Sequence, residues 1–372
     1  MPLFEKKRSI MFLPHELIIE ILLRLPVKSL LRFKCVCNLW SSLISRDSHF
    51  ANSHFQLSAT TSNPKILLIS TSTHEFRSID LETSLSDDSA SVSFNLPDYF
   101  TDFKIKGSCR GFILFCGSFN IYVWNPSTGL HKQIPFSPFG SDLDEADYFY
   151  GFGYDHSTND YLVVSMCHPL HLEYFSLKSN TWKEVEAPHF SYADMNIYRN
   201  QPKGGSLYNG AIHWLASCYD LPAEFNQVIA TFNLMERKLS YIHLPQDSDG
   251  NRLQLGGLWV YGEFLSIYTK NYRNDTVEIW VMKEYNVDSS WTRILVLPID
   301  LIICPNSVFF PLCCTKRGEI IVVDEDDGLV KYDKSGEFLD LRSYPHYDLR
   351  CKVTIYMGSL LSLPGDDDNK QY

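Results

Sequence analysis

The chain has 372 residues, 45% of them hydrophobic and 21% charged, an ordinary globular composition with ample material for a core. The net charge of −11 is uneven: residues 1–60 hold eight Lys and Arg against four Asp and Glu, which leaves 25 of 33 basic and 40 of 44 acidic residues in the remainder. A basic head on an acidic body indicates two modules, and it argues against nucleic-acid binding by the larger one, because phosphate backbones need clustered Lys and Arg.

After an N-terminal tail at residues 1–11, residues 12–46 predict three short helices. Pro14 suits the first turn of a helix, where its missing N–H costs nothing, and Pro26 ends that helix. Apolar residues recur at helical spacing in the three segments. They are Leu17, Ile18, Ile21, Leu22 and Leu25 in the first, Val27, Leu30, Leu31 and Phe33 in the second, and Leu39, Trp40, Leu43 and Ile44 in the third.

So small a helical unit buries little surface, and its first helix carries apolar residues on more than one stripe. An uncovered apolar face implies a partner. An ordinary helical cap, docked on the domain that follows, explains the same periodicity. The spacing of the apolar residues alone leaves both interpretations open.

The order of residues in this segment adds a stronger signal. Leu-Pro stands at the start, Leu-Pro-Val-Lys-Ser-Leu at residues 25–30, and Val36-Cys37-x-x-Trp40 at the end. With many fixed positions at fixed spacing, residues 12–50 resemble an F-box. The resemblance implies binding to a Skp-type linker protein, and through it to a cullin, with about half of the matching residues in the interface and the others holding the helices together. The expected contacts are Leu13, Pro14, Ile21, Leu22, Leu25, Pro26, Leu30, Val36, Cys37 and Trp40.

Residues 65–363, reached through an expected linker at residues 51–64, contain a repeat. Apolar strands begin at residues 65, 111, 161, 211, 263 and 319, which are 46 to 56 residues apart, and each is followed by further short strands and turns. Such a period predicts an all-β propeller of about six blades, with a range of six to eight. Residues 355–363 are expected to close the ring, and residues 364–372 form an acidic tail. A two-sheet sandwich is the alternative, although six units of this length are too many for one sandwich.

This body also resembles the F-box-associated, kelch-like domain of plant F-box proteins. The chain departs from strict kelch repeats, because Gly-Gly pairs occur only at Gly204-Gly205 and Gly256-Gly257. The pieces that carry the resemblance are Gly107-Ser-Cys-Arg-Gly111, Trp124-Asn-Pro-Ser-Thr128, Gly151-Phe-Gly-Tyr-Asp155, Tyr174-Phe-Ser-Leu-Lys-Ser-Asn-Thr-Trp182, Asn209-Gly-Ala-Ile-His-Trp-Leu215 and Glu278-Ile-Trp-Val-Met-Lys-Glu-Tyr285.

Motifs that would indicate catalysis are absent from the sequence. There is no phosphate-binding loop, nucleophile elbow, Cys-x-x-Cys or His-Glu-x-x-His. Cys167, His168 and His171 could face a metal, but a turn around Pro169 explains them more simply. We therefore expect no catalytic residue, metal or cofactor. A paired-carboxylate site for glycoside hydrolysis stays open as the enzymatic alternative.

The ten cysteines show no paired spacing, no secretory signal is visible, and no run of about 18 apolar residues could span a membrane. We expect free thiols, no membrane contact, and a cytoplasmic or nuclear location.

Target binding is expected on loops at one end of the ring, because loops vary while the scaffold stays rigid. The longest irregular stretches are residues 139–150, 189–201 and 219–227, of which the first is acidic and suggests a basic patch on the target. Its candidate contacts are Asp142, Asp144, Glu145, Asp147 and Tyr148.

The resulting hypothesis is a non-catalytic, substrate-recognition adaptor of a Skp–cullin–F-box ubiquitin ligase, which binds the linker through its helices and an unknown protein target through its propeller. Two alternatives are an F-box scaffold that acts outside ubiquitination, and a propeller enzyme or sugar-binding module whose helices are only a cap.

Overall fold

The structure is a computed structural model of the whole chain. It describes residues 13–364 except for residues 62, 71–74, 83–84, 86–91, 96–102, 118–119, 139–147, 168–170, 187–191, 194–203, 219–226, 247–254, 272–275, 299–309, 324–327 and 345–352.

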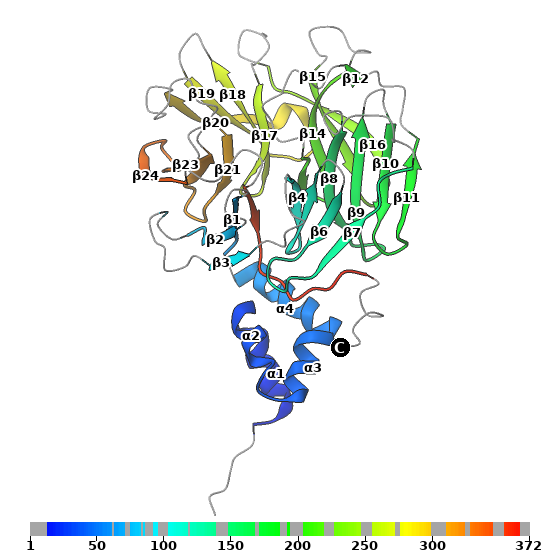
Figure 1. The fold of residues 1–372 in the computed structure, drawn as a ribbon. Coiled ribbons are helices and arrows are strands. Elements are labelled where there is room, and N and C mark those ends of the chain that lie inside the picture. The colour runs from blue at the N-terminus through cyan, green and yellow to red at the C-terminus, as the bar shows by residue number, and fades with distance from the viewer. Residues whose placement is uncertain are drawn as a thin grey trace, which may run out of the picture.

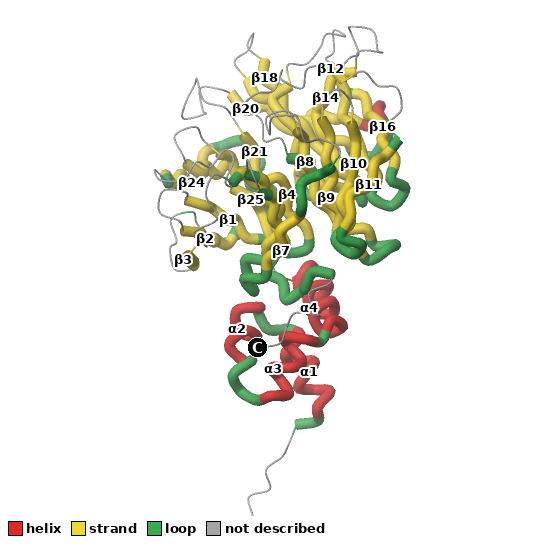
Figure 2. The backbone as a smooth tube through the Cα atoms, turned by 45° about the vertical axis from the view of Figure 1, so that its right-hand side comes forward, coloured by secondary structure: helices red, strands yellow, loops and turns green. Residues whose placement is uncertain are grey.

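Four helices stand together below an all-β body (Figures 1 and 2). The first two begin directly after Pro14 and Pro26, whose extended backbone leads into each helix. Each proline therefore ends one segment and starts the next. The helices are α1 (His15–Leu23), α2 (Val27–Phe33), α3 (Asn38–Arg46) and α4 (Ser48–Thr61).

Helix α4 was not among the three helices predicted from the sequence, which placed most of its residues in a linker. Its buried face contains Phe50 and Phe55 but also His54 and Ser58. Polar residues on that face blur the apolar pattern on which a helix prediction depends. The connection between the two modules is thus largely helical.

The body is a propeller of six sheets arranged around a ring. The first sheet contains β25 (Val353–Tyr356), β1 (Lys65–Ser70), β2 (Glu75–Asp80) and β3 (Val92–Asn95). The second sheet contains β4 (Lys104–Cys109), β5 (Phe112–Cys116), β6 (Ile121–Trp124) and β7 (His131–Ile134), and the third contains β8 (Tyr148–Asp155), β9 (Asp160–Cys167), β10 (His171–Ser176) and β11 (Thr181–Val185). The fourth contains β12 (Tyr192–Ala193), β13 (Ser206–Tyr208), β14 (Ala211–Cys218), β15 (Gln227–Asn233) and β16 (Lys238–His243). The fifth contains β17 (Leu255–Tyr261), β18 (Phe264–Asn271), β19 (Thr276–Met282) and β20 (Trp291–Pro298), and the sixth contains β21 (Phe310–Cys314), β22 (Ile320–Val323), β23 (Gly328–Tyr332) and β24 (Phe338–Ser343).

This architecture confirms the predicted fold class and its six repeats, and it excludes the two-sheet sandwich. Every strand pairing within the six sheets is antiparallel. Most pairs join strands that follow one another in the chain, and the exceptions are β25, which closes the ring against β1, and β12, which pairs with the end of β14.

Closure joins the two ends of the propeller. Strand β25 pairs antiparallel with β1, from Lys65 opposite Tyr356 to Leu68 opposite Val353. The closing strand therefore begins two residues before the expected segment and stops early within it. Residues 357–363 contain no strand and run under the ring toward the helices.

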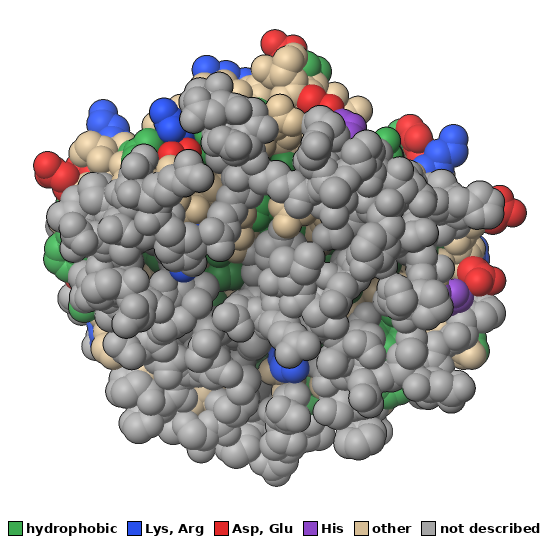
Figure 3. Space-filling view, turned by 90° about the horizontal axis from the view of Figure 1, so that it is seen from above, with side chains coloured by type: hydrophobic (Ala, Val, Ile, Leu, Met, Phe, Trp, Pro, Cys, Tyr) green, Lys and Arg blue, Asp and Glu red, His purple; other side chains and the backbone are tan. Residues whose placement is uncertain are grey.

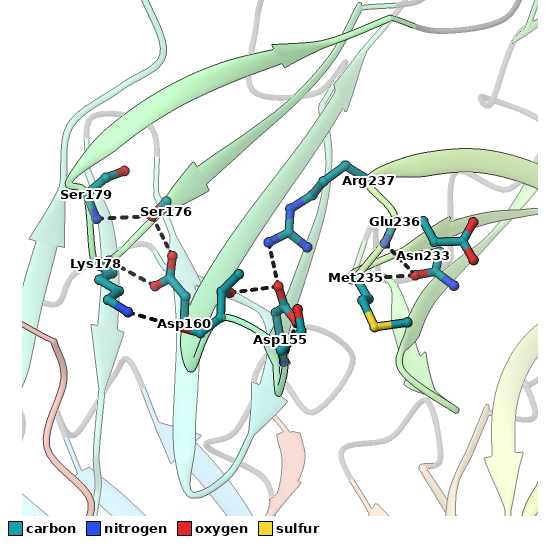
Figure 4. A network of polar contacts seen from close by, with 11 residues as sticks. Asp155, Asp160, Ser176, Lys178, Ser179, Asn233, Met235, Glu236 and Arg237 are labelled. Atoms are coloured by element: carbon teal, nitrogen blue, oxygen red, sulfur yellow. Dashed lines mark hydrogen bonds and ion pairs between the residues drawn. The ribbon is translucent and has the colours of Figure 1, made fainter.

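Turns at the helix-facing end also join neighbouring sheets. Arg237, in the turn after β15, reaches Asp155 at the end of β8, with 2.7 Å between Nη2 and Oδ2 (Figure 4). The Asp155 carboxylate also accepts hydrogen bonds from the backbone and hydroxyl of Ser157 and from the hydroxyl of Thr158. Burial alone would raise the pKa of Asp155, but these donors outweigh it and hold the pKa well below its usual range.

Candidate partner-binding surface

Large apolar side chains lie exposed on the first three helices. This is unusual for an ordinary soluble surface when several gather on one small unit. Figure 1 shows α1 to α3 at the end of the molecule away from the propeller, so the blades do not cover them. The exposed fractions are 57% for Leu13, 50% for Leu17 and Ile21, 59% for Val36 and 56% for Leu39.

The ten linker contacts expected from the sequence divide into two groups. Four pack inward: Leu22 and Leu30 are fully buried, and Leu25 and Trp40 lie partly buried against the same core. The other six are exposed: Leu13, Pro14, Ile21, Pro26, Val36 and Cys37.

Leu17 and Leu39 belong to the exposed surface but were not named among the expected contacts. Leu17 lies one turn before Ile21 in α1, so the two side chains share one face of the helix. Helical periodicity could have placed Leu17 beside Ile21, whereas only the packing of α3 shows that Leu39 points outward.

A single hydrophobic core runs from the helices into the propeller. It includes Leu30 from α2, Phe55 from α4, Phe112 from β5 and Phe152 from β8. Modules that share a core in this way do not turn freely against each other, because rotation would expose apolar surface. The helices are therefore presented at a fixed position below the ring.

Arg110 strengthens this joint from the propeller side. It occupies the turn between β4 and β5, where its guanidinium lies 4.1 Å from the ring centroid of Tyr154 and 5.0 Å from that of Phe55. Its Nη2 donates to Oδ1 of Asn52 in α4 over 2.8 Å. Gly111, next to it, has φ of +84°, and a Cβ there would stand 2.2 Å from Cβ of Ser359. Only glycine fits this close approach.

Asn125 fixes the segment that follows β25. Its side chain is fully buried, and Nδ2 donates to the carbonyl oxygens of Ser359 at 3.1 Å and Leu361 at 3.3 Å. Its Oδ1 accepts from the backbone N–H of Ser127, and the Ser127 hydroxyl accepts from the backbone N–H of Ser359. Leu360, Leu361 and Leu363 then join the core shared with the helices.

Replacing Asn125 by alanine is expected to leave two buried carbonyls without a donor and to lower the free energy of unfolding by about 2–4 kcal/mol. Chemical denaturation measures this loss. Hydrogen exchange is expected to rise in α4 as well as in residues 357–363, because they share a core. Unchanged exchange in α4 would contradict the coupling between the two modules.

His54 lies on the buried face of α4, with 2.9 Å between its Nε2 and the carbonyl oxygen of Leu25. Burial lowers its pKa, against the opposing effect of that hydrogen bond. The neutral ring thus fastens α4 to the end of the first helix.

Of the expected target contacts, Asp142, Asp144, Glu145 and Asp147 lie outside the described residues. Tyr148 is the first residue of β8, and its ring is buried and stacked on Tyr150 at 5.9 Å between centroids. Figure 3 looks onto the end of the propeller that faces away from the helices, and most atoms there belong to residues outside the described ones.

Of the residues weighed for metal binding, His168 lies outside the described residues, whereas Cys167 and His171 form ordinary contacts. Cys167 is buried and lies near the carbonyl oxygen of His171, while the two ring nitrogens of His171 lie 3.5 Å from Glu173 and 3.3 Å from Glu184. Within the described part of the chain, no group of three or more His, Cys, Asp or Glu is placed to hold a metal ion. No helix in that part is long and apolar enough to cross a membrane.

Comparison with protein families matches both modules. Residues 10–52 match the F-box domain, and residues 58–360 match the F-box associated beta propeller domain. The chain therefore belongs to the F-box proteins that carry this propeller. F-box domains generally bind Skp-type linkers, F-box proteins are generally non-catalytic adaptors, and neither match names a catalytic activity.

Individual relatives agree with the family. An F-box/kelch-repeat protein of Arabidopsis thaliana is 29% identical over 311 residues, covering 77% of this chain and 81% of its own. The F-box protein CPR1 of the same plant is 26% identical over 390 residues, covering 97% and 91%. Among solved structures, apo AztD from Citrobacter koseri is 11% identical with a TM-score of 0.43, covering 76% of this chain and 82% of that one. The match is to the associated propeller and does not confirm the kelch-like character expected from the sequence.

Proposed function

We propose that the protein is the substrate-recognition adaptor of a Skp–cullin–F-box ubiquitin ligase. The observation that carries the proposal is the exposed apolar surface of Leu13, Leu17, Ile21, Val36 and Leu39 on an F-box whose other large apolar side chains, such as Leu22, Leu30 and Trp40, are already packed. Such a surface gains free energy by docking on a linker protein. In this role no residue of the chain performs covalent chemistry.

The role is geometric. The helices hold the linker, the linker holds the cullin, and the propeller holds the target near the ubiquitin carrier, so that transfer becomes effectively intramolecular. The joint described above supports this role, because a rigid connection keeps the distance between the bound target and the carrier within narrow limits.

Target capture is assigned to the propeller end away from the helices. The start of β8, at Tyr148, lies at this end, since the opposite end of β8, at Asp155, turns beside the helices. The acidic residues Asp142, Asp144, Glu145 and Asp147 remain the first candidates, with a basic patch on the target as their partner.

The test is binding to a purified plant Skp-type linker by titration calorimetry, comparing the native chain with a Leu17→Ala, Ile21→Ala double variant. Both side chains are exposed and outside the shared core, and alanine favours a helix, so the variant is expected to fold normally. Burying one such side chain stabilises a complex by roughly 1.5–3 kcal/mol, so the double variant is expected to weaken binding at least about 100-fold.

A Met235→Ala variant is the matched control, because Met235 is 64% exposed in a turn of the propeller. It is expected to bind like the native chain. No binding by the folded native chain would refute the adaptor. Binding without transfer of ubiquitin, in a reconstituted ligase, to either a captured target or the adaptor itself would instead indicate a scaffold.

A further inference from the structure

A cavity of about 470 Å³ lies between the helices and the propeller. Its walls come from the end of α3, from α4, from the turns after β4 and β8, and from the segment after β25. It is separate from the exposed apolar surface of α1 to α3. Its polar lining includes Arg46, Asp47, Asn52, Arg110, His156 and Asn159.

Arg110 is the central group of this lining. Its guanidinium is held between two aromatic rings, and Asn52 accepts from its Nη2, but no carboxylate of the described residues forms an ion pair with it. Its Nε is buried and has no acceptor. A guanidinium partly removed from water without a counter-ion is costly, and an anion that reaches it would remove that cost.

The other charges of the lining favour the same kind of ligand. Arg46, the last residue of α3, also lines the cavity, and its exposed side chain forms no ion pair within the described residues. The one carboxylate, that of Asp47, already accepts from the backbone N–H of Phe50 over 2.9 Å and caps α4. The lining residues thus include two arginines and one carboxylate that is already bonded, a positive balance in a chain of net charge −11.

We propose that the cavity binds a small phosphate-like oxyanion, free or carried on a small molecule, through Arg110 and Arg46. Planar guanidinium groups match the oxygens of such an anion with paired hydrogen bonds, which suit phosphate better than a spherical halide. The amides of Asn52 and Asn159 supply further polar contacts for a carrier molecule.

Binding there would act on the joint. Because Arg46 belongs to the helices and Arg110 to the propeller, an anion held by both bridges the two modules and stabilises the orientation in which they are packed. This role goes beyond the proposed adaptor function and requires no linker protein or target.

The test is thermal unfolding of the full chain with increasing inorganic phosphate, glucose 6-phosphate or glucose, with chloride used to keep the ionic strength constant. The unfolding midpoint is expected to rise with either phosphate and not with glucose. A rise with inorganic phosphate alone assigns the site to the free ion, and a stronger rise with glucose 6-phosphate assigns it to a phosphorylated small molecule.

Two variants locate the effect. Arg46→Gln leaves the packing of the joint intact and is expected to weaken phosphate binding about tenfold or more. A folded Arg110→Gln variant is expected to weaken it by a similar factor. Arg317→Gln is the matched control, because it removes the same charge from an exposed turn of the propeller and is expected to keep native binding.

The proposal is overturned if phosphate has no effect on the native chain, or if Arg46→Gln responds to phosphate as the native chain does. An equal loss of the response to phosphate in Arg46→Gln and Arg317→Gln would also overturn it, since this would show that phosphate acts through the overall charge of the protein.

Discussion

Replacing Asp155 by alanine is expected to lower the free energy of unfolding by about 3–5 kcal/mol, the usual cost of removing one partner of a buried ion pair. The Asp155 side chain is 1% exposed, and its loss leaves the Arg237 guanidinium, 21% exposed, without its carboxylate. The pair joins the turns of two neighbouring sheets (Figure 4), so its loss also weakens their contact. Urea denaturation followed by tryptophan fluorescence measures the change.

Asp333→Ala is the matched control for this prediction. Asp333 accepts from the backbone and hydroxyl of Ser335 in the same way as Asp155 does from Ser157, but it is only partly buried and has no arginine partner among the described residues. Its replacement is expected to cost much less. If both variants lose the same free energy of unfolding, Asp155 stabilises the protein through its local turn and not through the ion pair.

The ion pair of Asp155 and Arg237 should also make the stability of the protein depend on pH in the acid range. Because the folded pKa of Asp155 lies below its ordinary value, its contribution is fully present above the unfolded pKa of about 4 and is lost as the pH falls from there through the folded pKa. Native stability is therefore expected to fall below pH 4 more steeply than that of Asp155→Ala.

Lowering the pH from about 6.5 to 4 is expected to remove about 3 kcal/mol of stability through His213 alone. His213 is buried, with Nδ1 3.1 Å from the carbonyl oxygen of Ser206 and Nε2 2.9 Å from the hydroxyl of Tyr285. Since the carbonyl only accepts, Nδ1 carries the proton, and Nε2 accepts from Tyr285 while the ring is neutral. Burial lowers the pKa of His213 to about 4, against the opposing effect of the Ser206 carbonyl.

The sign follows from proton binding. Between pH 6.5 and 4 the unfolded chain binds a proton at this ring that the folded chain does not, so stability decreases as the pH falls. Stability measured across this range is expected to lose that slope in His213→Gln and to keep it in His156→Gln, whose ring is exposed. The same slope in all three proteins would exclude His213 as its source.

The sequence could show the propeller because its most buried strands are also its most apolar. The six apolar starts at residues 65, 111, 161, 211, 263 and 319 lie within one residue of β1, β5, β9, β14, β18 and β22. Each is an inner strand covered on both faces, so it reads as a continuous apolar run. Outer strands such as β11, half exposed, carry a weaker pattern.

Less of the candidate site could be predicted. The pattern at residues 12–40 located the F-box, but it could not separate Leu22, which is buried, from Ile21 beside it, which is exposed. That division depends on where α4 packs, and α4 was missed because His54 and Ser58 lie on its inner face. The role of Arg110 and Asn125 in the joint depends on contacts with residues more than 50 and 230 positions away, which no local pattern contains.

The pairing of β25 with β1 has a consequence for how the protein is made. The F-box helices and β1 leave the ribosome first, whereas Val353 follows Lys65 by 288 residues, about 15 to 60 seconds later at ordinary rates of synthesis. Until then β1 lacks one of its two neighbouring strands, and the leucines after β25 are missing from the core that the helices share with the propeller. If the protein is the adaptor proposed above, a growing chain exposes the apolar surface of its helices well before it can hold a target, and a chain that stops early would occupy the linker without bringing a target to it.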